Sequence, residues 1–124
     1  VVELLIKLKF LNIKRCILTN GNPATQENKI KNLKLGKYFD KIVYARNFKK
    51  EKPSSISFNY ISNYFNTYGN KILFIGDSIQ NDIMPANKLG MKTILIKHHN
   101  SKKIISSNIS TLNQNQLLGI LNYL

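Results

Sequence analysis

Short apolar runs alternate with segments of helical periodicity along this chain of 124 residues. Four runs, at 15–19, 41–45, 71–75 and 93–96, have the length and the β-branched content of strands. Between them, apolar residues recur every three or four positions, which predicts helices. The alternation predicts an α/β fold, a three-layer Rossmann-like parallel sheet flanked by helices. The length is that of about one domain, so we expect a single domain over residues 1–124.

Capping and turn residues predict where several helices begin and end. Asn22 followed by Pro23 predicts a helix start, and Gly36 predicts the end of that largely polar helix. A later helix, with Pro85 in its first turn, is expected to begin near Asp82. Apolar periodicity predicts three further helices, which cover residues 1–11, the segment from Pro53 onward, and 111–124.

The charge balance is strongly basic, because 19 Lys and Arg stand against 6 Asp and Glu for a formal charge of +13. Nucleic acid and anionic membranes are therefore the first partners to consider. Lys, Asn and Ile each occur 17 times, however, and all three have A/T-rich codons. Base composition of the gene is thus an open alternative explanation, and we expect neither nucleic acid nor a membrane as the partner.

Cysteine usage and hydropathy bear on the compartment. The single cysteine, Cys16, excludes an intramolecular disulfide and fits a reducing cytosol. No apolar stretch approaches the roughly 18 residues that a membrane span needs. The first residues lack the basic and apolar regions of a signal peptide. We therefore expect a cytoplasmic protein.

Polar residues follow two of the predicted strands, at 19–21 and at 76–78, at the end of the sheet where ligands bind in parallel α/β folds. Thr19, Asn20 and Gly21 combine a hydroxyl, an amide and a glycine backbone, which can cradle phosphoryl oxygens. Lys52 precedes Pro53 at a helix start, where its ammonium could reach an anion near the sheet. Taken singly, the first stretch could also be an ordinary turn and the second a solvated basic loop.

Two carboxylates flank the loop after the clearest strand. Asp77 and Asp82 are five positions apart. Carboxylate oxygens suit Mg²⁺, which takes one or two carboxylates and keeps several waters. Asp82 could equally be a helix N-cap, and the sequence leaves both interpretations open.

Together and in this order, the three stretches resemble the haloacid dehalogenase superfamily of phosphohydrolases. The resemblance covers most of the chain, from about residue 4 to residue 96. The segments that match the second, third and fourth motifs of the family are Leu18-Thr19-Asn20-Gly21, Lys52-Pro53 and Gly76-Asp77-Ser78-Ile79-Gln80-Asn81-Asp82.

The resemblance implies a small phosphorylated metabolite as the substrate. It implies that Thr19 hydrogen-bonds a phosphoryl oxygen, with Asn20 and the Gly21 amide beside it. Lys52 is the implied catalytic residue, since it would neutralise phosphate charge and steady the nucleophile as charge builds in the transition state.

Mg²⁺ is the cofactor that the resemblance implies. Asp77 would ligate the metal directly, and Asp82 would hold a metal-bound water or orient Lys52. The metal would supply Lewis-acid charge neutralisation and would position the substrate.

One motif of the family is not matched. The family's nucleophile is the first Asp of an Asp-x-Asp motif on an upstream strand. This sequence contains only Asp40, Asp77 and Asp82, and no two are separated by one residue. The chain therefore resembles the C-terminal portion of such an enzyme, without the nucleophile strand and the cap domain. We expect no turnover of phosphate esters by these residues alone.

The absent strand has a consequence for the sheet. In the family it lies between the first and third strands predicted here, so its absence leaves two apolar strand edges unpaired. We expect an altered strand order, pairing with another chain through these edges, or marginal stability.

A non-catalytic alternative is a basic binding module for nucleic acid or another anionic partner. Cations interleaved with aromatic rings can bind single-stranded nucleic acid. The candidate residues cluster around the predicted polar helix and its exit: Lys29, Lys31, Lys34, Lys37 and Lys41, with Tyr38 and Phe39 nearby.

Overall fold

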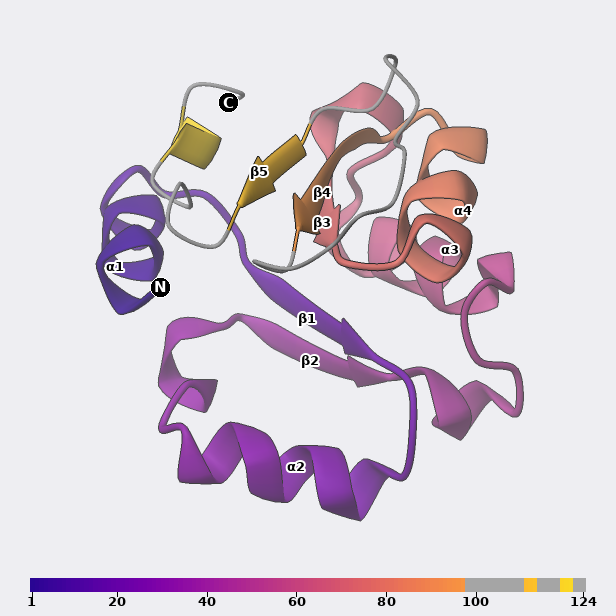
Figure 1. The fold of residues 1–124 in the computed structure, drawn as a ribbon, viewed down its shortest axis with the longest axis horizontal. Coiled ribbons are helices and arrows are strands. Elements are labelled where there is room, and N and C mark those ends of the chain that lie inside the picture. The colour runs from indigo at the N-terminus through magenta and orange to yellow at the C-terminus, as the bar shows by residue number, and fades with distance from the viewer. Residues whose placement is uncertain (98–110, 114–118, 122–124) are drawn as a thin grey trace. The chain divides into compact units, whose positions relative to one another are not determined.

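The computed structural model describes residues 1–97, 111–113 and 119–121. Helices and parallel strands alternate along these residues, which confirms the predicted α/β class (Figure 1). The chain divides into two compact units, Val1–Ile61 and Ser62–Leu124, and each is described by itself. The expectation of a single domain over 1–124 stays a prediction.

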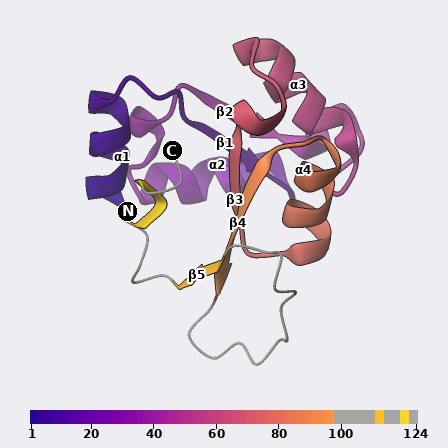
Figure 2. The ribbon, with the colours of Figure 1, turned by 90° about the horizontal axis from the view of Figure 1, so that it is seen from above.

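The first unit contains a two-stranded parallel sheet. Its elements are α1 (Val2–Phe10), β1 (Cys16–Thr19), α2 (Pro23–Asn32), the 3-10 helices η1 (Gly36–Tyr38) and η2 (Ala45–Phe48), β2 (Lys41–Tyr44) and the start of α3 (Ser55–Phe65). Leu4, Leu5 and Leu8 form the buried face of α1. Thr19 lies opposite Tyr44 in the strand register, so β1 and β2 end side by side. Helix α2, which connects them, runs beside this pair (Figure 2).

The second unit contains a three-stranded parallel sheet in the order β3-β4-β5. Its further elements are η3 (Gly69–Lys71), β3 (Leu73–Gly76), the π-helix η4 (Ile79–Ile83), α4 (Met84–Lys88), β4 (Lys92–Lys97) and β5 (Thr111–Asn113). Ile83, Ala86 and Ile94 are fully buried and supply the centre of its core. The polar loop after β3 therefore follows a strand and precedes a helix whose inner side is firmly packed.

The α-helices in the described part of the chain end in the same closure. A residue with positive φ follows each helix: Asn12, Lys34, Asn66 and Gly90. After α2, the Leu35 N–H donates to the Ile30 carbonyl and the Lys34 N–H donates to the Lys31 carbonyl. This is the Schellman arrangement, in which glycine usually takes the left-handed position. The prediction that Gly36 ends α2 is wrong, because Lys34 adopts the left-handed conformation and closes the helix earlier.

The start of α2 agrees with the sequence prediction. Asn22 Oδ1 accepts hydrogen bonds from the N–H groups of Ala24 and Thr25 at 2.9 and 3.3 Å. Pro23 occupies the first turn, where its missing N–H is not needed. The prediction of this helix start is confirmed.

The prediction of a helix over 111–124 is wrong for residues 111–113. These residues form β5, which pairs in parallel with β4 from Leu95 to Lys97. Pairing with a formed strand satisfies the backbone groups of this segment, and local periodicity does not foresee such a distant partner. Residues 114–118 and 122–124, which the prediction of a helix also covers, lie outside the described residues.

The strands that lead into two of the candidate motifs, β1 and β3, are each the outermost strand of their sheet. Within the described residues, β1 is hydrogen-bonded to β2 alone and β3 to β4 alone. All residues of β1 are half-buried, and Ile75 of β3 is 39% exposed. Apolar side chains on strand edges of this kind are what the sequence analysis predicts for a sheet without its central strand.

No helix among the described residues combines the length and the apolar composition that crossing a bilayer requires.

Candidate functional site

The turn after β1 is shaped by Gly21. The backbone of this residue has φ +92°, a left-handed conformation that side chains disfavour. A Cβ on Gly21 would also lie 3.0 Å from the Gln26 amide nitrogen. Thr19 ends β1, and its hydroxyl donates to the Asn20 carbonyl at 3.1 Å. Glycine is therefore needed for the chain to turn directly behind the threonine and the asparagine.

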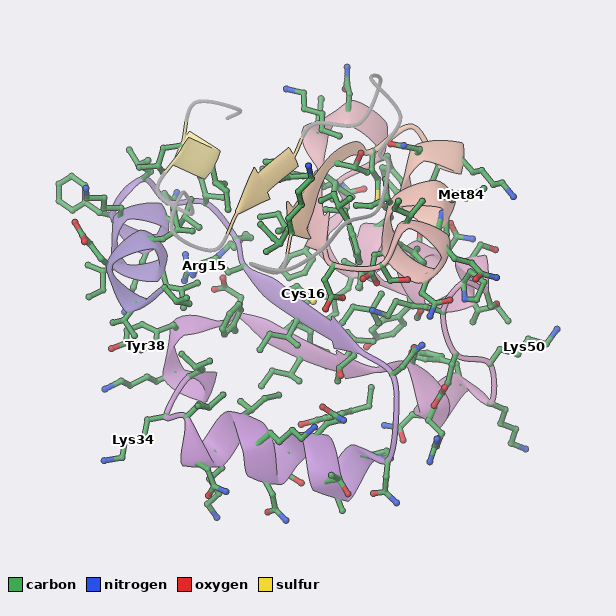
Figure 3. All side chains as sticks on the ribbon, viewed as in Figure 1. Arg15, Cys16, Lys34, Tyr38, Lys50 and Met84 are labelled. Carbon is green, nitrogen blue, oxygen red and sulfur yellow. The ribbon has the colours of Figure 1, made fainter. Side chains whose placement is uncertain are left out.

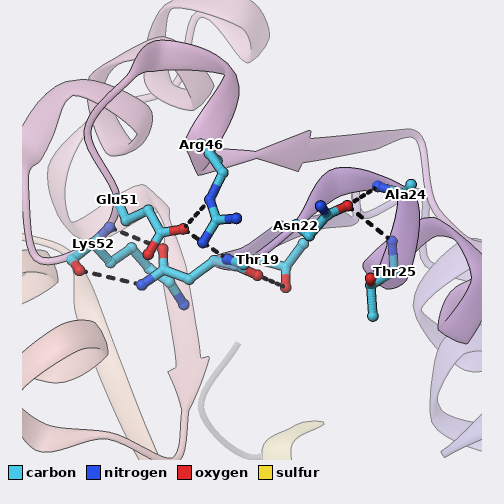
Figure 4. A network of polar contacts seen from close by, with 9 residues as sticks. Thr19, Asn22, Ala24, Thr25, Arg46, Glu51 and Lys52 are labelled. Carbon is cyan, nitrogen blue, oxygen red and sulfur yellow. Dashed lines mark hydrogen bonds and ion pairs between the residues drawn. The ribbon is translucent and has the colours of Figure 1, made fainter.

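Asn20 binds the backbone of Lys52 through both ends of its side-chain amide. Its Nδ2 donates to the Lys52 carbonyl at 3.2 Å, and its Oδ1 accepts from the Lys52 N–H at 2.9 Å (Figure 4). The Lys52 ammonium donates to the Leu18 carbonyl at 3.5 Å. Residues 32 positions apart are thus brought together, and the second and third motifs become neighbours.

A carboxylate that the sequence analysis did not select joins this group. Glu51 Oε1 accepts hydrogen bonds from the Gly21 N–H and from Arg46 Nε, each at 2.9 Å. The Gly21 hydrogen bond, followed by the Arg46 contact, holds the pKa of Glu51 below its ordinary value. The Gly21 N–H, which the resemblance places beside the phosphate, therefore binds Glu51 in this structure. The position of Glu51, directly before Lys52 and among other lysines, was the only signal in the sequence.

The fourth motif forms a compact loop in the second unit. Asp77 is exposed directly after β3, whereas Asp82 is only 5% exposed. Asp82 Oδ2 accepts a hydrogen bond from the Ser78 N–H at 3.2 Å. The Asp82 side chain packs against Gly76, where a Cβ would lie 2.5 Å from Asp82 Cβ. Only glycine at position 76 leaves room for this carboxylate.

The N-cap interpretation of Asp82 is wrong. Ser78 takes that position, because its hydroxyl accepts a hydrogen bond from the Asn81 N–H at 3.1 Å. The helical segment begins at Ile79 with a π-turn, three residues before the predicted start. Asp82 therefore lies inside the helical segment, and its carboxylate is directed back to the loop after β3.

The donor set of this loop fits Mg²⁺. Among the residues that the structure describes, no group of three or more His, Cys, Asp or Glu side chains could hold a metal ion. Mg²⁺ does not require such a group, because it takes one or two carboxylates and retains water. Asp77 presents an exposed carboxylate, and Asp82 presents a second one anchored by Ser78.

The candidate residues fall into two sets. Thr19, Asn20, Gly21 and Lys52 lie together in the first unit. Asp77 and Asp82 belong to the loop and helix of the second unit.

Cys16 is not a candidate nucleophile. Burial in β1 raises the pKa of its thiol to about 12, and the nearby Lys41 offsets only part of that effect. The thiol therefore stays protonated at neutral pH and behaves as a small hydrophobic side chain.

The residues of the binding-module alternative lie mostly at the surface. Lys29, Lys31, Lys34 and Lys37 are exposed, and Figure 3 shows Lys34 pointing away from the ribbon. The Lys37 ammonium lies 5.3 Å from the centre of the Tyr38 ring, so a cation already covers this aromatic face. A base would have to displace that cation to stack on Tyr38. The alternative stays a prediction.

Solved structures share the fold. A HAD phosphatase from Thermococcus onnurineus matches 97% of this chain and 55% of its own length, with a TM-score of 0.83 and 23% identity. The HAD hydrolase YfnB from Bacillus subtilis, in a form bound to magnesium, matches 98% of this chain and 54% of its own length, with a TM-score of 0.81 and 23% identity. These matches show the fold of the chain.

Sequence comparison gives the family. Glyceraldehyde 3-phosphate phosphatase from Pyrococcus abyssi is 31% identical over 96 residues, which are 77% of this chain and 40% of that enzyme. The chain thus spans about two fifths of the length of this enzyme and of the glyceraldehyde 3-phosphate phosphatases from Methanocaldococcus jannaschii and Pyrococcus furiosus. The model of the haloacid dehalogenase-like hydrolases matches residues 1–96. The chain therefore belongs to the haloacid dehalogenase-like hydrolase family.

Proposed function

We propose that these residues are the phosphate- and Mg²⁺-binding part of a phosphatase that acts on a small phosphorylated metabolite. The observation that carries the proposal is the pairing of Asn20 with the Lys52 backbone, which joins two motifs of the family at the end of β1. Phosphate binding needs a hydroxyl or amide donor and a nearby cation, and this pairing supplies both in one unit.

Each residue of the first set has a proposed role toward phosphate. The Thr19 hydroxyl donates to a phosphoryl oxygen once it turns from the Asn20 carbonyl that it now contacts. The Lys52 ammonium neutralises phosphate charge from the loop that Asn20 holds. Asn20 is a positioning residue in this proposal, because both ends of its amide are engaged with backbone.

Asp77 and Asp82 are the proposed ligands of Mg²⁺. Asp77 binds the metal directly through its exposed carboxylate, and Asp82 holds a metal-bound water from its anchored position. When bound, Mg²⁺ supplies charge neutralisation at the phosphoryl group. The structural neighbour YfnB is bound to magnesium, which supports Mg²⁺ as the cofactor.

The nucleophile of the reaction comes from outside these residues. The sequence has no Asp-x-Asp motif, so we propose that these residues do not hydrolyse phosphate esters alone. A strand that carries the motif, in a second chain, would pair with the edge of β1 or of β3. This proposal is supported by the strand order, since β1 and β3 are each the outermost strand of their sheet.

The substrate class and the compartment rest on comparison and composition. The Pyrococcus abyssi relative is a glyceraldehyde 3-phosphate phosphatase, which supports a small phosphate monoester as the substrate. The single cysteine supports the cytoplasm as the compartment.

Binding of inorganic phosphate tests the proposal. The dissociation constant is measured by NMR titration of the chain, with Lys52→Met and the matched control Lys50→Met, whose wild-type side chain points away from the ribbon (Figure 3). Losing a charge-assisted contact weakens binding by about tenfold or more in the first variant. The control stays within about twofold of wild type, as expected for a solvent-screened charge that is directed away from the ribbon. Equal weakening in both variants would contradict the proposal and favour the basic binding module.

A further inference from the structure

One oxygen atom connects three segments of the first unit. Glu51 Oε1 accepts from the Gly21 N–H, in the turn after β1, and from Arg46 Nε, in the 3-10 helix after β2. Glu51 itself lies in the loop before α3 (Figure 4). The ends of both strands of the sheet are thereby tied to the segment that carries Lys52.

Glu51 and its neighbour Lys52 are held by two adjacent residues of the turn after β1. Asn20 and Gly21 are adjacent in sequence, and so are Glu51 and Lys52. Asn20 binds the Lys52 backbone with two hydrogen bonds, and Gly21 binds Glu51 with one. Two consecutive residues on each side are therefore fastened together, so a rotation of the Glu51 peptide would also displace Lys52.

Charge makes Glu51 suited to this position. A carboxylate accepts hydrogen bonds from a guanidinium and a backbone N–H more strongly than a neutral amide does. The Arg46 and Glu51 side chains are 53% and 34% exposed, which limits the energy of the pair through solvent screening. We therefore expect Glu51 to orient the loop before α3 more than to raise the overall stability of the fold.

We propose that Glu51 is a positioning residue for phosphate binding, oriented by Arg46, which fixes the Gly21 peptide and the place of Lys52. This inference rests on the proposed function. Neither the motifs of the sequence nor the comparisons assign a role to Glu51 or Arg46.

The test uses the full chain with Glu51→Ala, Glu51→Gln and the control Glu27→Gln, an exposed carboxylate of α2. Two quantities are measured by NMR: the amide shifts of Gly21, Asn20 and Lys52 without ligand, including the side-chain amide of Asn20, and the dissociation constant of inorganic phosphate. In Glu51→Ala the amides of all three residues shift, and phosphate binding weakens by about threefold to fivefold, in line with an exposed ion pair. Glu51→Gln keeps the oxygen acceptor and gives an intermediate loss, and the control matches wild type.

Three results would overturn the proposal or separate it from the proposed function. A folded Glu51→Ala variant with an unchanged Asn20 side-chain amide signal and unchanged phosphate affinity overturns it, even where the melting temperature falls. If the wild-type chain binds no phosphate, the proposed function fails. The positioning role is then decided by whether the side-chain amide of Asn20, which donates to the Lys52 carbonyl, shifts in Glu51→Ala and not in the control.

A titration of the wild type covers the case of an unfolded variant. The amide proton of Gly21 is followed from about pH 7 to about pH 3. A transition with a midpoint below about 4.3, the ordinary value for Glu, supports the contact. A Gly21 signal that does not respond to pH overturns it.

Discussion

The two sets of candidate residues are built from contacts of different range. In the first unit, Asn20 and Gly21 are held by residues 32 and 30 positions away. In the second unit, Gly76, Ser78 and Asp82 shape one another within seven consecutive residues. The set in the first unit therefore comes together only once the sheet has formed, whereas the set in the second unit is a local structure of one loop. Hydrogen bonds between distant loops control the first set, and local sterics control the second.

A substitution at Gly76, in the set of the second unit, has the largest expected effect on the free energy of unfolding. In Gly76→Ala, the new Cβ would lie 2.5 Å from Asp82 Cβ, so the buried aspartate or the strand must move. We expect a loss of about 2–3 kcal/mol in the free energy of unfolding, as for overpacked sites. Urea denaturation measures it.

Gly36→Ala is the matched control, because the nearest atom to its new Cβ is an Ile30 methyl at 3.8 Å. The stability of this variant stays within about 0.5 kcal/mol of wild type. Similar losses in both variants would contradict the close packing of Gly76 on Asp82.

Removing the long-range contacts of Asn20, in the set of the first unit, lowers the free energy of unfolding by a smaller amount. Asn20→Ala removes two hydrogen bonds to the Lys52 backbone and lowers the free energy of unfolding by about 1–2 kcal/mol. Asn28→Ala, on the exposed side of α2, serves as the reference and changes stability by less than about 0.5 kcal/mol. Equal stabilities of the two variants in urea would show that the Asn20 contacts do not hold the loops together.

The residues that close α2 and α4 differ in type, and this difference offers a substitution that stabilises the fold. α2 in the first unit closes on Lys34 with φ 55°, whereas α4 in the second unit closes on Gly90 with φ 79°. Lys34→Gly relieves the strain of the left-handed backbone conformation and raises the free energy of unfolding by about 0.5–1 kcal/mol. Lys31→Gly, inside α2, has the opposite sign, with a loss of about 1 kcal/mol. Thermal unfolding that shows a loss for both variants would refute the assignment of Lys34 to the closing position.

The pH response of Glu51 is the smallest expected effect. Its folded-state pKa lies below the ordinary value because of Gly21 and Arg46, so its contribution to stability is present at neutral pH. That contribution is lost as the pH falls through the lowered pKa. The difference in unfolding free energy between wild type and Glu51→Gln is therefore constant above about pH 5 and shrinks toward about pH 3. A difference that grows on acidification would reverse the sign of this assignment.

Local signals in the sequence predicted what depends on local physics. The strands follow from β-branched runs, and the start of α2 follows from Asn22 and Pro23, which cap and open the helix. The rule that ligands bind at the carboxyl ends of parallel strands directed attention to Thr19, Asn20 and Gly21, and to the loop after β3. The motif resemblance gave the family, which the match over residues 1–96 confirms.

Features that depend on distant partners were not predicted. β5 forms because β4 offers a strand edge, and no local pattern in residues 111–113 announces that partner. The role of Glu51 arises from Gly21 and Arg46, which periodicity does not bring near it. Lys34 closes α2 in a conformation that its residue type disfavours, so the glycine rule pointed to Gly36 instead.

We propose that this chain carries phosphate- and Mg²⁺-binding groups and lacks the nucleophile. Hydrolysis of p-nitrophenyl phosphate by the purified chain is measured over a range of Mg²⁺ concentrations, beside the variant Asp77→Asn. Both proteins are expected to give the same rate, equal to that of buffer with Mg²⁺. A rate that rises with Mg²⁺ for the chain and is abolished in Asp77→Asn would show that the chain turns over phosphate esters without an Asp-x-Asp nucleophile, against the proposed function.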